Sequence, residues 1–113
     1  MTLRFDLRIN QGETFEIAIP VLDANDNPVS LAGTTVKGQI RSHAASPTVL
    51  HEWSAANFNV AFDGNDVVLS VPATASSAWS FRTGRWSVEL TDGSGVTTRL
   101  VDGMVIVHPE VVR

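Results

Sequence analysis

Apolar and polar residues alternate along most of this chain, and that pattern constrains its fold more than any other feature. Near the start, Leu3, Phe5, Leu7 and Ile9 occupy every second position, with polar residues between them. Successive side chains of a β-strand point to opposite faces, so this alternation is typical of a half-buried strand. Similar segments predict strands at residues 15–21, 36–40, 58–62, 67–71, 86–90 and 96–107, and residues 48–53 can form a further short strand.

Turn-forming residues separate these segments. Asp63-Gly64-Asn65-Asp66 and Asp92-Gly93-Ser94-Gly95 predict hairpins, because Gly and Asn adopt positive φ at little cost. Residues 23–28 form another dense turn cluster. Pro20 lacks an amide donor and therefore predicts that its strand lies at a sheet edge or is bulged near its end. Residues 96–107 are expected to form one long strand, or two strands broken at Asp102-Gly103, where a bulge or kink is expected.

The expected fold is therefore all-β: an antiparallel, immunoglobulin-like β-sandwich of about eight strands with one short helix. Residues 72–79, which are rich in Ala and Ser and begin with a proline, are the helix candidate. No shift in composition marks a linker, so residues 1–113 are expected to form a single domain. Pro109 is expected to end the last strand, which leaves residues 109–113 as an extended tail.

Charge and composition argue against several classes of partner. The net charge is -4 and the eight Lys and Arg residues are scattered, so no nucleic-acid footprint is visible. Neither a basic amphipathic anchor nor an apolar stretch of membrane-spanning length is present in the sequence. Cysteine is absent, which excludes disulfides, thiol catalysis and cysteine-based zinc sites. We expect no nucleic-acid partner, no membrane partner and no cofactor.

Residues that could carry catalysis or bind a metal do not form a recognisable pattern. Ser94 is flanked by glycines but lies in a hairpin turn without the nucleophile-elbow pattern. The three histidines, His43, His51 and His108, lack the spacing of metal ligands and are expected in loops or in solvent. The chain is therefore predicted not to be an enzyme.

Oxygen-bearing side chains at Asp23, Asn25 and Asn27 have the alternate spacing of a calcium loop. However, Pro28 stands where such a loop needs glycine, and Thr34 stands where it needs a bidentate glutamate. The segment is instead expected to form a turn in which side-chain oxygens accept backbone hydrogen bonds.

Three tryptophans offer the chain's most distinctive side chains. Trp86 shares the inward parity of Val88 and is expected in the core, whereas Trp79 is expected to anchor the short helix over a sheet edge or open end. The neighbouring residues do not predict whether Trp53 is buried or exposed. An exposed Trp53 could stack on a sugar ring, with the loop acids at residues 23–26 beside it.

Several segments resemble, in their order along the chain, a family of small β-sandwich proteins encoded among bacteriophage structural genes, especially in phages of actinobacteria. They include Gly-Glu-Thr-Phe at residues 12–15 and the Leu-Asp-Ala-Asn-Asp-Asn-Pro-Val-Ser-Leu-Ala-Gly-Thr-Thr-Val run at residues 22–36. A Lys/Gln/Ile/Arg strand at residues 37–41, a strand leading into an Ala-rich helix at residues 67–75, the hairpin at residues 84–95 and the ending at residues 100–113 complete the resemblance. One departure is Trp86, where tyrosine is commoner.

The resemblance implies a virion component, assembled in the host cytoplasm: a tail, baseplate or fibre-associated domain, or a decoration subunit on the capsid. It implies other virion proteins as partners, several copies of the chain around a symmetry axis, and no catalytic residues.

The first strand is the leading candidate for such contacts, because an edge strand can pair with the sheet of a neighbour. Leu3, Phe5 and Leu7 would be its anchors, unless it is simply an edge strand of its own sandwich. The tail beyond Pro109, with Val111, is the second candidate. The alternative function is a carbohydrate- or receptor-binding module that uses Trp53 to contact a host-surface glycan.

Overall fold

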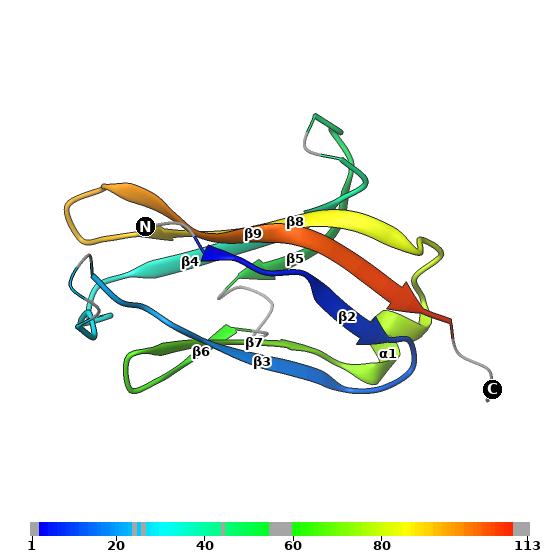
Figure 1. Cartoon of the computed structure of the whole chain (residues 1–113), viewed down its shortest axis with the longest axis horizontal. Helices are drawn as coiled ribbons and strands as arrows, with labels where there is room; N and C mark the ends of the chain where they lie inside the picture. The colour runs from blue at the N-terminus through cyan, green and yellow to red at the C-terminus, as the bar shows by residue number, and fades with distance from the viewer. Residues whose placement is uncertain (1–2, 24, 26, 44, 55–59, 110–113) are drawn as a thin grey trace.

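Two β-sheets packed face to face form the described part of the chain (Figure 1). The computed structural model describes residues 3–23, 25, 27–43, 45–54 and 60–109. The larger sheet, called sheet A, contains β1 (Leu3–Arg4), β2 (Leu7–Asn10), β9 (Thr97–His108), β8 (Thr83–Thr91), β4 (Thr35–Arg41) and β5 (Val49–Ser54). The smaller sheet, called sheet B, contains β3 (Phe15–Pro20), β7 (Asp66–Val71) and β6 (Val60–Asp63).

The strand order confirms the predicted all-β sandwich. In sheet A, β1 and β2 lie beside β9, followed by β8, β4 and β5, and sheet B has the order β3-β7-β6. This division of strands between two sheets is that of a β-sandwich. All pairings are antiparallel except those of β1 and β2, which run parallel to β9. The first strands thus lie at an edge of their own sheet, beside the last strand of the chain.

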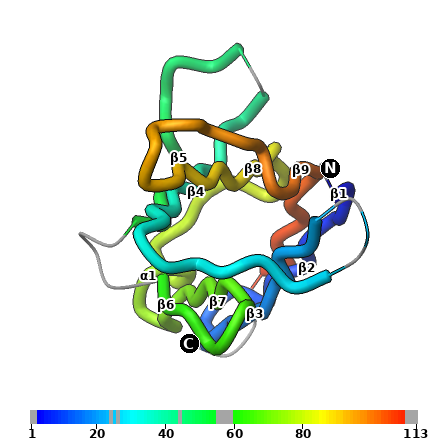
Figure 2. The backbone as a smooth tube through the Cα atoms, turned by 90° about the vertical axis from the view of Figure 1, so that its left-hand side faces the viewer, coloured from blue at the N-terminus to red at the C-terminus, as the bar shows by residue number. Residues whose placement is uncertain are grey.

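The core lies between the two sheets, which Figure 2 shows end on, and residues of the inward parity of most strands are buried there. Trp86 and Trp53 meet there with ring centroids 6.1 Å apart in an edge-to-face arrangement, which places Trp86 in the core as predicted. The Trp53 indole N–H donates to the Ser70 carbonyl at 3.1 Å and so connects sheet A to sheet B. Gly38 is needed beside it, because a Cβ there would lie 3.0 Å from the Trp53 ring.

The predicted turns and the helix are also confirmed. Gly64 (φ 62°) closes the β6–β7 hairpin and Gly95 (φ 84°) the β8–β9 hairpin. The helix α1 (Ala73–Ser77) begins after Pro72 and is shorter than expected. It is held against the β2–β3 turn, where the Gly12 amide donates to the buried Ser76 hydroxyl at 2.9 Å. Strand β3, which ends at Pro20, lies at an edge of sheet B.

The bulge or kink expected at residues 102–103 is wrong, and the alternative of one long strand is confirmed. Strand β9 continues through Asp102 and Gly103, and the irregularity lies at Leu100, where β9 has one residue more than β8. Gly103 instead allows the backbone of Phe5 to lie close to β9, because glycine has no Cβ. The chain leaves the β9 ladder between β1 and β2, and the Phe5 carbonyl lies directly over Gly103. The first predicted strand is therefore divided in two.

Gly103→Ala is expected to lower the free energy of unfolding by about 1–3 kcal/mol, since its Cβ would overlap the Phe5 carbonyl oxygen. Denaturant unfolding followed by tryptophan fluorescence measures this. Gly93→Ala is the matched control, because a Cβ at Gly93 meets nothing closer than the Gly33 carbonyl at 3.9 Å. Equal stability of the two variants would contradict the proposed role of Gly103.

Candidate interaction surface

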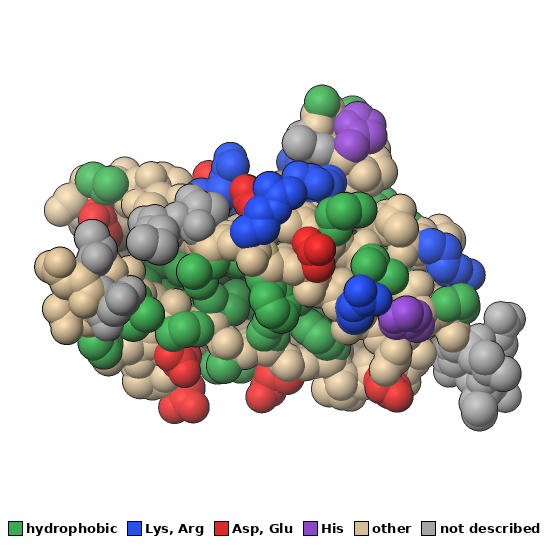
Figure 3. Space-filling model, viewed as in Figure 1, with side chains coloured by type: hydrophobic (Ala, Val, Ile, Leu, Met, Phe, Trp, Pro, Cys, Tyr) green, Lys and Arg blue, Asp and Glu red, His purple; other side chains and the backbone are tan. Residues whose placement is uncertain are grey.

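One side of the sandwich is open between β1–β2 of sheet A and β3 of sheet B. Apolar side chains form a band along this side (Figure 3). Two hollows of about 360 and 380 Å³ lie along it, and Phe5 and Ile17 line both. Leu3, Ile19 and Val101 line only the larger hollow, and Phe15 only the smaller. We call this feature the edge groove.

The interruption after β1 exposes the apolar side chains at the rim of the groove. The Phe5 amide donates to the Asp102 carbonyl at 2.9 Å, and the Phe5 carbonyl accepts the Trp86 indole N–H at 2.8 Å. The Asp6 carboxylate accepts the Met104 amide at 2.9 Å, where a backbone carbonyl would otherwise pair. These bonds fix the backbone while the Phe5 side chain remains 53% exposed and Leu3 39% exposed.

The two borders of the groove differ in charge. Arg4 and Arg8 lie on the sheet A border, together with Asp6, and Glu16 lies on the sheet B border. The strands of sheet B contain no Lys or Arg, whereas their acids are Glu16, Asp63 and Asp66. Sheet A contains Arg4, Arg8, Lys37, Arg41, Arg85 and Arg99 in its strands. Figure 3 shows a cluster of cationic side chains above the apolar band, with acidic side chains among them, and acidic side chains below the band.

The predicted contact residues are divided by this geometry. Leu3 and Phe5 are exposed on the edge groove and are available for contact. Leu7 is 1% exposed and belongs to the core, so its prediction as an interface anchor is wrong. Trp53 is fully buried, which rules it out as a stacking platform for sugars. Val111 lies outside the described residues. Ile17 also lines the groove but was not predicted as a contact residue. Its position in the alternating pattern assigns it to the inner face of β3 and does not show that the sandwich is open beside it.

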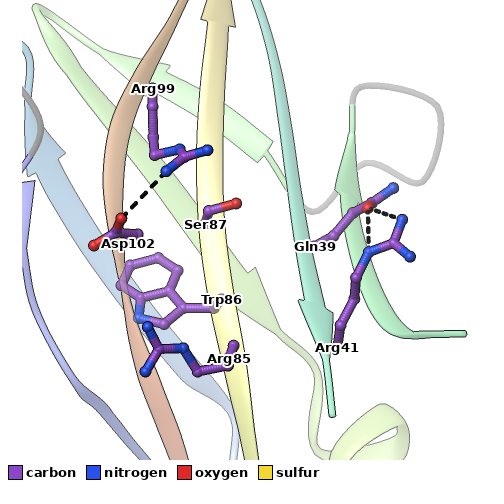
Figure 4. A pocket seen from close by; sticks show the side chains of 7 residues that line it. All are labelled: Gln39, Arg41, Arg85, Trp86, Ser87, Arg99 and Asp102. Atoms are coloured by element: carbon purple, nitrogen blue, oxygen red, sulfur yellow. Dashed lines mark hydrogen bonds and ion pairs between the residues drawn. The ribbon is translucent and has the colours of Figure 1, made fainter. Parts of the chain in front are cut away.

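A further hollow, separate from the edge groove, lies on the outer face of sheet A (Figure 4). It has a volume of about 220 Å³ and is lined by Gln39, Arg41, Arg85, Trp86, Ser87, Arg99 and Asp102. Arg99 forms an ion pair with Asp102 at 3.5 Å, and the Arg41 guanidinium turns away to Gln39 and the Ser46 carbonyl. Within the described residues the Arg85 side chain has neither a hydrogen bond nor an ion pair. The hollow therefore offers one uncompensated guanidinium to an anionic group.

His51 lies in an aromatic cluster at the β5 edge rather than in a loop or in solvent, where it was expected. Its ring is 4.9 Å from that of Trp53 and 5.3 Å from that of Trp79, measured between centroids. Trp79 packs against the core and on Phe81, which confirms its role beside the helix. Burial of the imidazole lowers the pKa of His51 below its ordinary value of 6.5, against a smaller opposing effect of Glu52. The buried Nε2 atom has no hydrogen-bond partner in the part of the chain that the structure describes.

The other candidate residues occupy turns. The Asp23 carboxylate accepts hydrogen bonds from the backbone N–H groups of Asn25 and Asn27 at 2.8 and 3.0 Å, as expected for a turn. The Asp92 carboxylate accepts the amides of Ser94 and Val96, so Ser94 belongs to the hairpin. Among the residues that the structure describes, His, Asp and Glu side chains do not gather into a group able to hold a metal. No helix in the described ranges is long and apolar enough to cross a membrane.

No protein-family model matches the chain, and no curated protein sequence matches it.

The stability of the domain is expected to fall as the pH drops below about 6.5. Because burial lowers the pKa of His51 in the folded state, the unfolded chain binds more protons below its own pKa. Unfolding free energies from denaturant titrations between pH 8 and pH 5 measure the effect. His51→Phe should reduce this pH dependence, whereas His43→Gln, on an exposed loop, should retain it. An unchanged pH dependence in His51→Phe would count against the assignment.

Proposed function

We propose that this chain is a non-enzymatic structural protein of a bacteriophage virion. It acts through protein–protein contacts in the tail, baseplate or fibre region, or as a decoration subunit on the capsid. Its partners are other virion proteins and further copies of the chain, rather than nucleic acid or a membrane. The edge groove is the observation that carries this proposal, and the resemblance of the sequence to phage β-sandwich proteins supports it.

The groove favours assembly for two physical reasons. Its exposed apolar side chains, Leu3 and Phe5, gain roughly 25 cal/mol for each Å² that a partner removes from water. Strands β1, β2 and β3 also lie at sheet edges, where backbone groups on the outer side are available to another strand. A partner that covers the groove therefore satisfies apolar and backbone groups together.

A receptor-binding module is the second candidate, and the Arg85 hollow is the observation that favours it. The unpaired guanidinium, with Gln39 and Ser87 beside it, suits a carboxylate-bearing sugar. This site replaces Trp53, which is buried, as the contact surface of that alternative.

Mass spectrometry and imaging of purified particles test the leading proposal. The chain should copurify with virions at a fixed number of copies and should map to one part of the particle. Its absence from virions would overturn the proposal.

Phe5→Ser is expected to reduce the number of copies in each particle, because loss of a buried aromatic at an interface costs about 2 kcal/mol or more, roughly 30-fold in affinity. Quantitative mass spectrometry of particles measures the change. Phe62→Ser is the matched control: Phe62 is 46% exposed, but it lies on β6 at the far edge of sheet B. Equal incorporation of both variants would show that the groove is not the contact.

Titration of the purified chain with acidic oligosaccharides distinguishes the second candidate. If the Arg85 hollow binds them, Arg85→Ala should weaken binding by about tenfold or more, since a hydrogen bond to a charged group contributes about 1.5–3 kcal/mol. Neutral sugars of equal length serve as the control. Absence of binding would exclude these ligands.

A further inference from the structure

We infer that the edge groove is the place where two copies of this chain meet, around a two-fold axis that runs along the groove. The inference rests on the proposed assembly function and names one partner for it, a second copy. Two features of the groove specify this arrangement: the direction of its strands and the charge of its borders.

The strands at the two borders run in opposite directions. Strand β2 runs parallel to β9, and the turn at residues 11–14 leads into β3, which returns along the groove (Figure 1). A two-fold axis along the groove preserves each strand's direction along that axis and exchanges the two borders. It therefore places β1–β2 of one copy antiparallel to β3 of the other. Because the sheets of a sandwich pack about 10 Å apart, both such pairs form at once.

The charges of the borders select this axis over the alternative. With the axis along the groove, the sheet A border of each copy faces the sheet B border of the other, which carries Glu16. The sheet A border carries Arg8, Asp6 and Arg4, of which Arg4 is paired with Asp102 at 3.9 Å, so Arg8 is the cation that faces Glu16. With the axis across the groove, the arginines of the two copies would face one another, and so would the glutamates. Opposite charges then attract in the first arrangement and like charges repel in the second.

Arg8 and Glu16 are the pair on which this contact is best tested. Both line the smaller hollow, so they lie at the same level along the groove. Within the described residues neither side chain forms a hydrogen bond or an ion pair. In the two-fold arrangement Arg8 of each copy meets Glu16 of the other, which gives two ion pairs related by symmetry.

The size of the contact predicts a dimer of moderate affinity. Residues 3–10 span about 26 Å as extended chain, and two sheet edges with their side chains are about 20 Å wide, so each copy buries roughly 500 Å². The total of about 1,000 Å² is at the lower limit of stable interfaces. A dissociation constant on the order of 1–100 μM is expected.

Sedimentation velocity of the full chain between about 1 and 300 μM tests the arrangement. Wild-type protein should pass from monomer to dimer over this range. Arg8→Glu alone and Glu16→Arg alone should each weaken the dimer by tenfold or more, because each places two like-charged pairs in the contact. Lys37→Glu, which changes an exposed charge on β4 away from the groove, is the matched control and should dimerise as wild type.

Two rescue measurements make the test specific for the proposed symmetry. The double variant R8E/E16R should regain the dimer, because the charges are exchanged on both borders. An equimolar mixture of R8E and E16R should form a heterodimer, since each contact then joins opposite charges. Thermal unfolding followed by circular dichroism establishes that each variant is folded. A monomer at every concentration, or a dimer insensitive to these substitutions, would overturn the inference.

The outcomes separate this inference from the proposed function. A chain that is present in virions but remains monomeric in solution, with R8E incorporated normally, overturns the two-fold contact and leaves the virion role standing. A dimer with the predicted charge response in a chain absent from virions overturns the virion role alone.

Discussion

The position of the Phe5 carbonyl is the constraint on which the open side of this sandwich depends. It lies over Gly103, where no Cβ can be accommodated, and accepts the indole N–H of the buried Trp86. These contacts hold the first segment of the chain to β9 and divide it into β1 and β2. They also direct Phe5 outward, while Leu7 two residues later turns into the core. The first segment thus contributes to an exposed surface at Phe5 and to the core at Leu7, on either side of the point where the chain leaves the β9 ladder.

Charged residues that are scattered along the sequence are distributed unequally between the two sheets of the fold. The basic residues of the described strands all lie in sheet A, and the strands of sheet B carry only acids. The net charge of -4 conceals this separation. Since a sandwich presents both sheets at its open sides, each rim of the groove carries the charge of its own sheet. The charges thereby favour one orientation of a partner in the groove, whereas the apolar floor by itself would permit several orientations.

The aromatic residues serve the interior more than the surface. Trp53 and Trp86 each donate their indole N–H to a backbone carbonyl on another segment, at Ser70 and Phe5 respectively. Each therefore fills the core and fixes a second element in place. His51 completes the cluster at the β5 edge, with a ring nitrogen that has no partner among the described residues, so the same packing that stabilises the domain is expected to make it less stable in acid. Stacking on sugars is not open to Trp53, because the sheets enclose it.

Alternation and turn chemistry by themselves determined the class of fold, the two hairpins, the helix after Pro72 and the edge position of β3, since these features depend on neighbours in sequence. The positions of Trp53 and Leu7, the continuity of β9 and the parallel pairing of β1 and β2 were decided only by tertiary structure. Period-two patterning assigns a residue to a face of its strand, but exposure also depends on whether another sheet covers that face. Leu3, Phe5 and Leu7 share one parity in the sequence. Leu3 and Phe5 nevertheless lie on the open side of the sandwich and Leu7 lies in its core, and this difference accompanies the approach of Phe5 to Gly103, which lies 98 positions further along the chain.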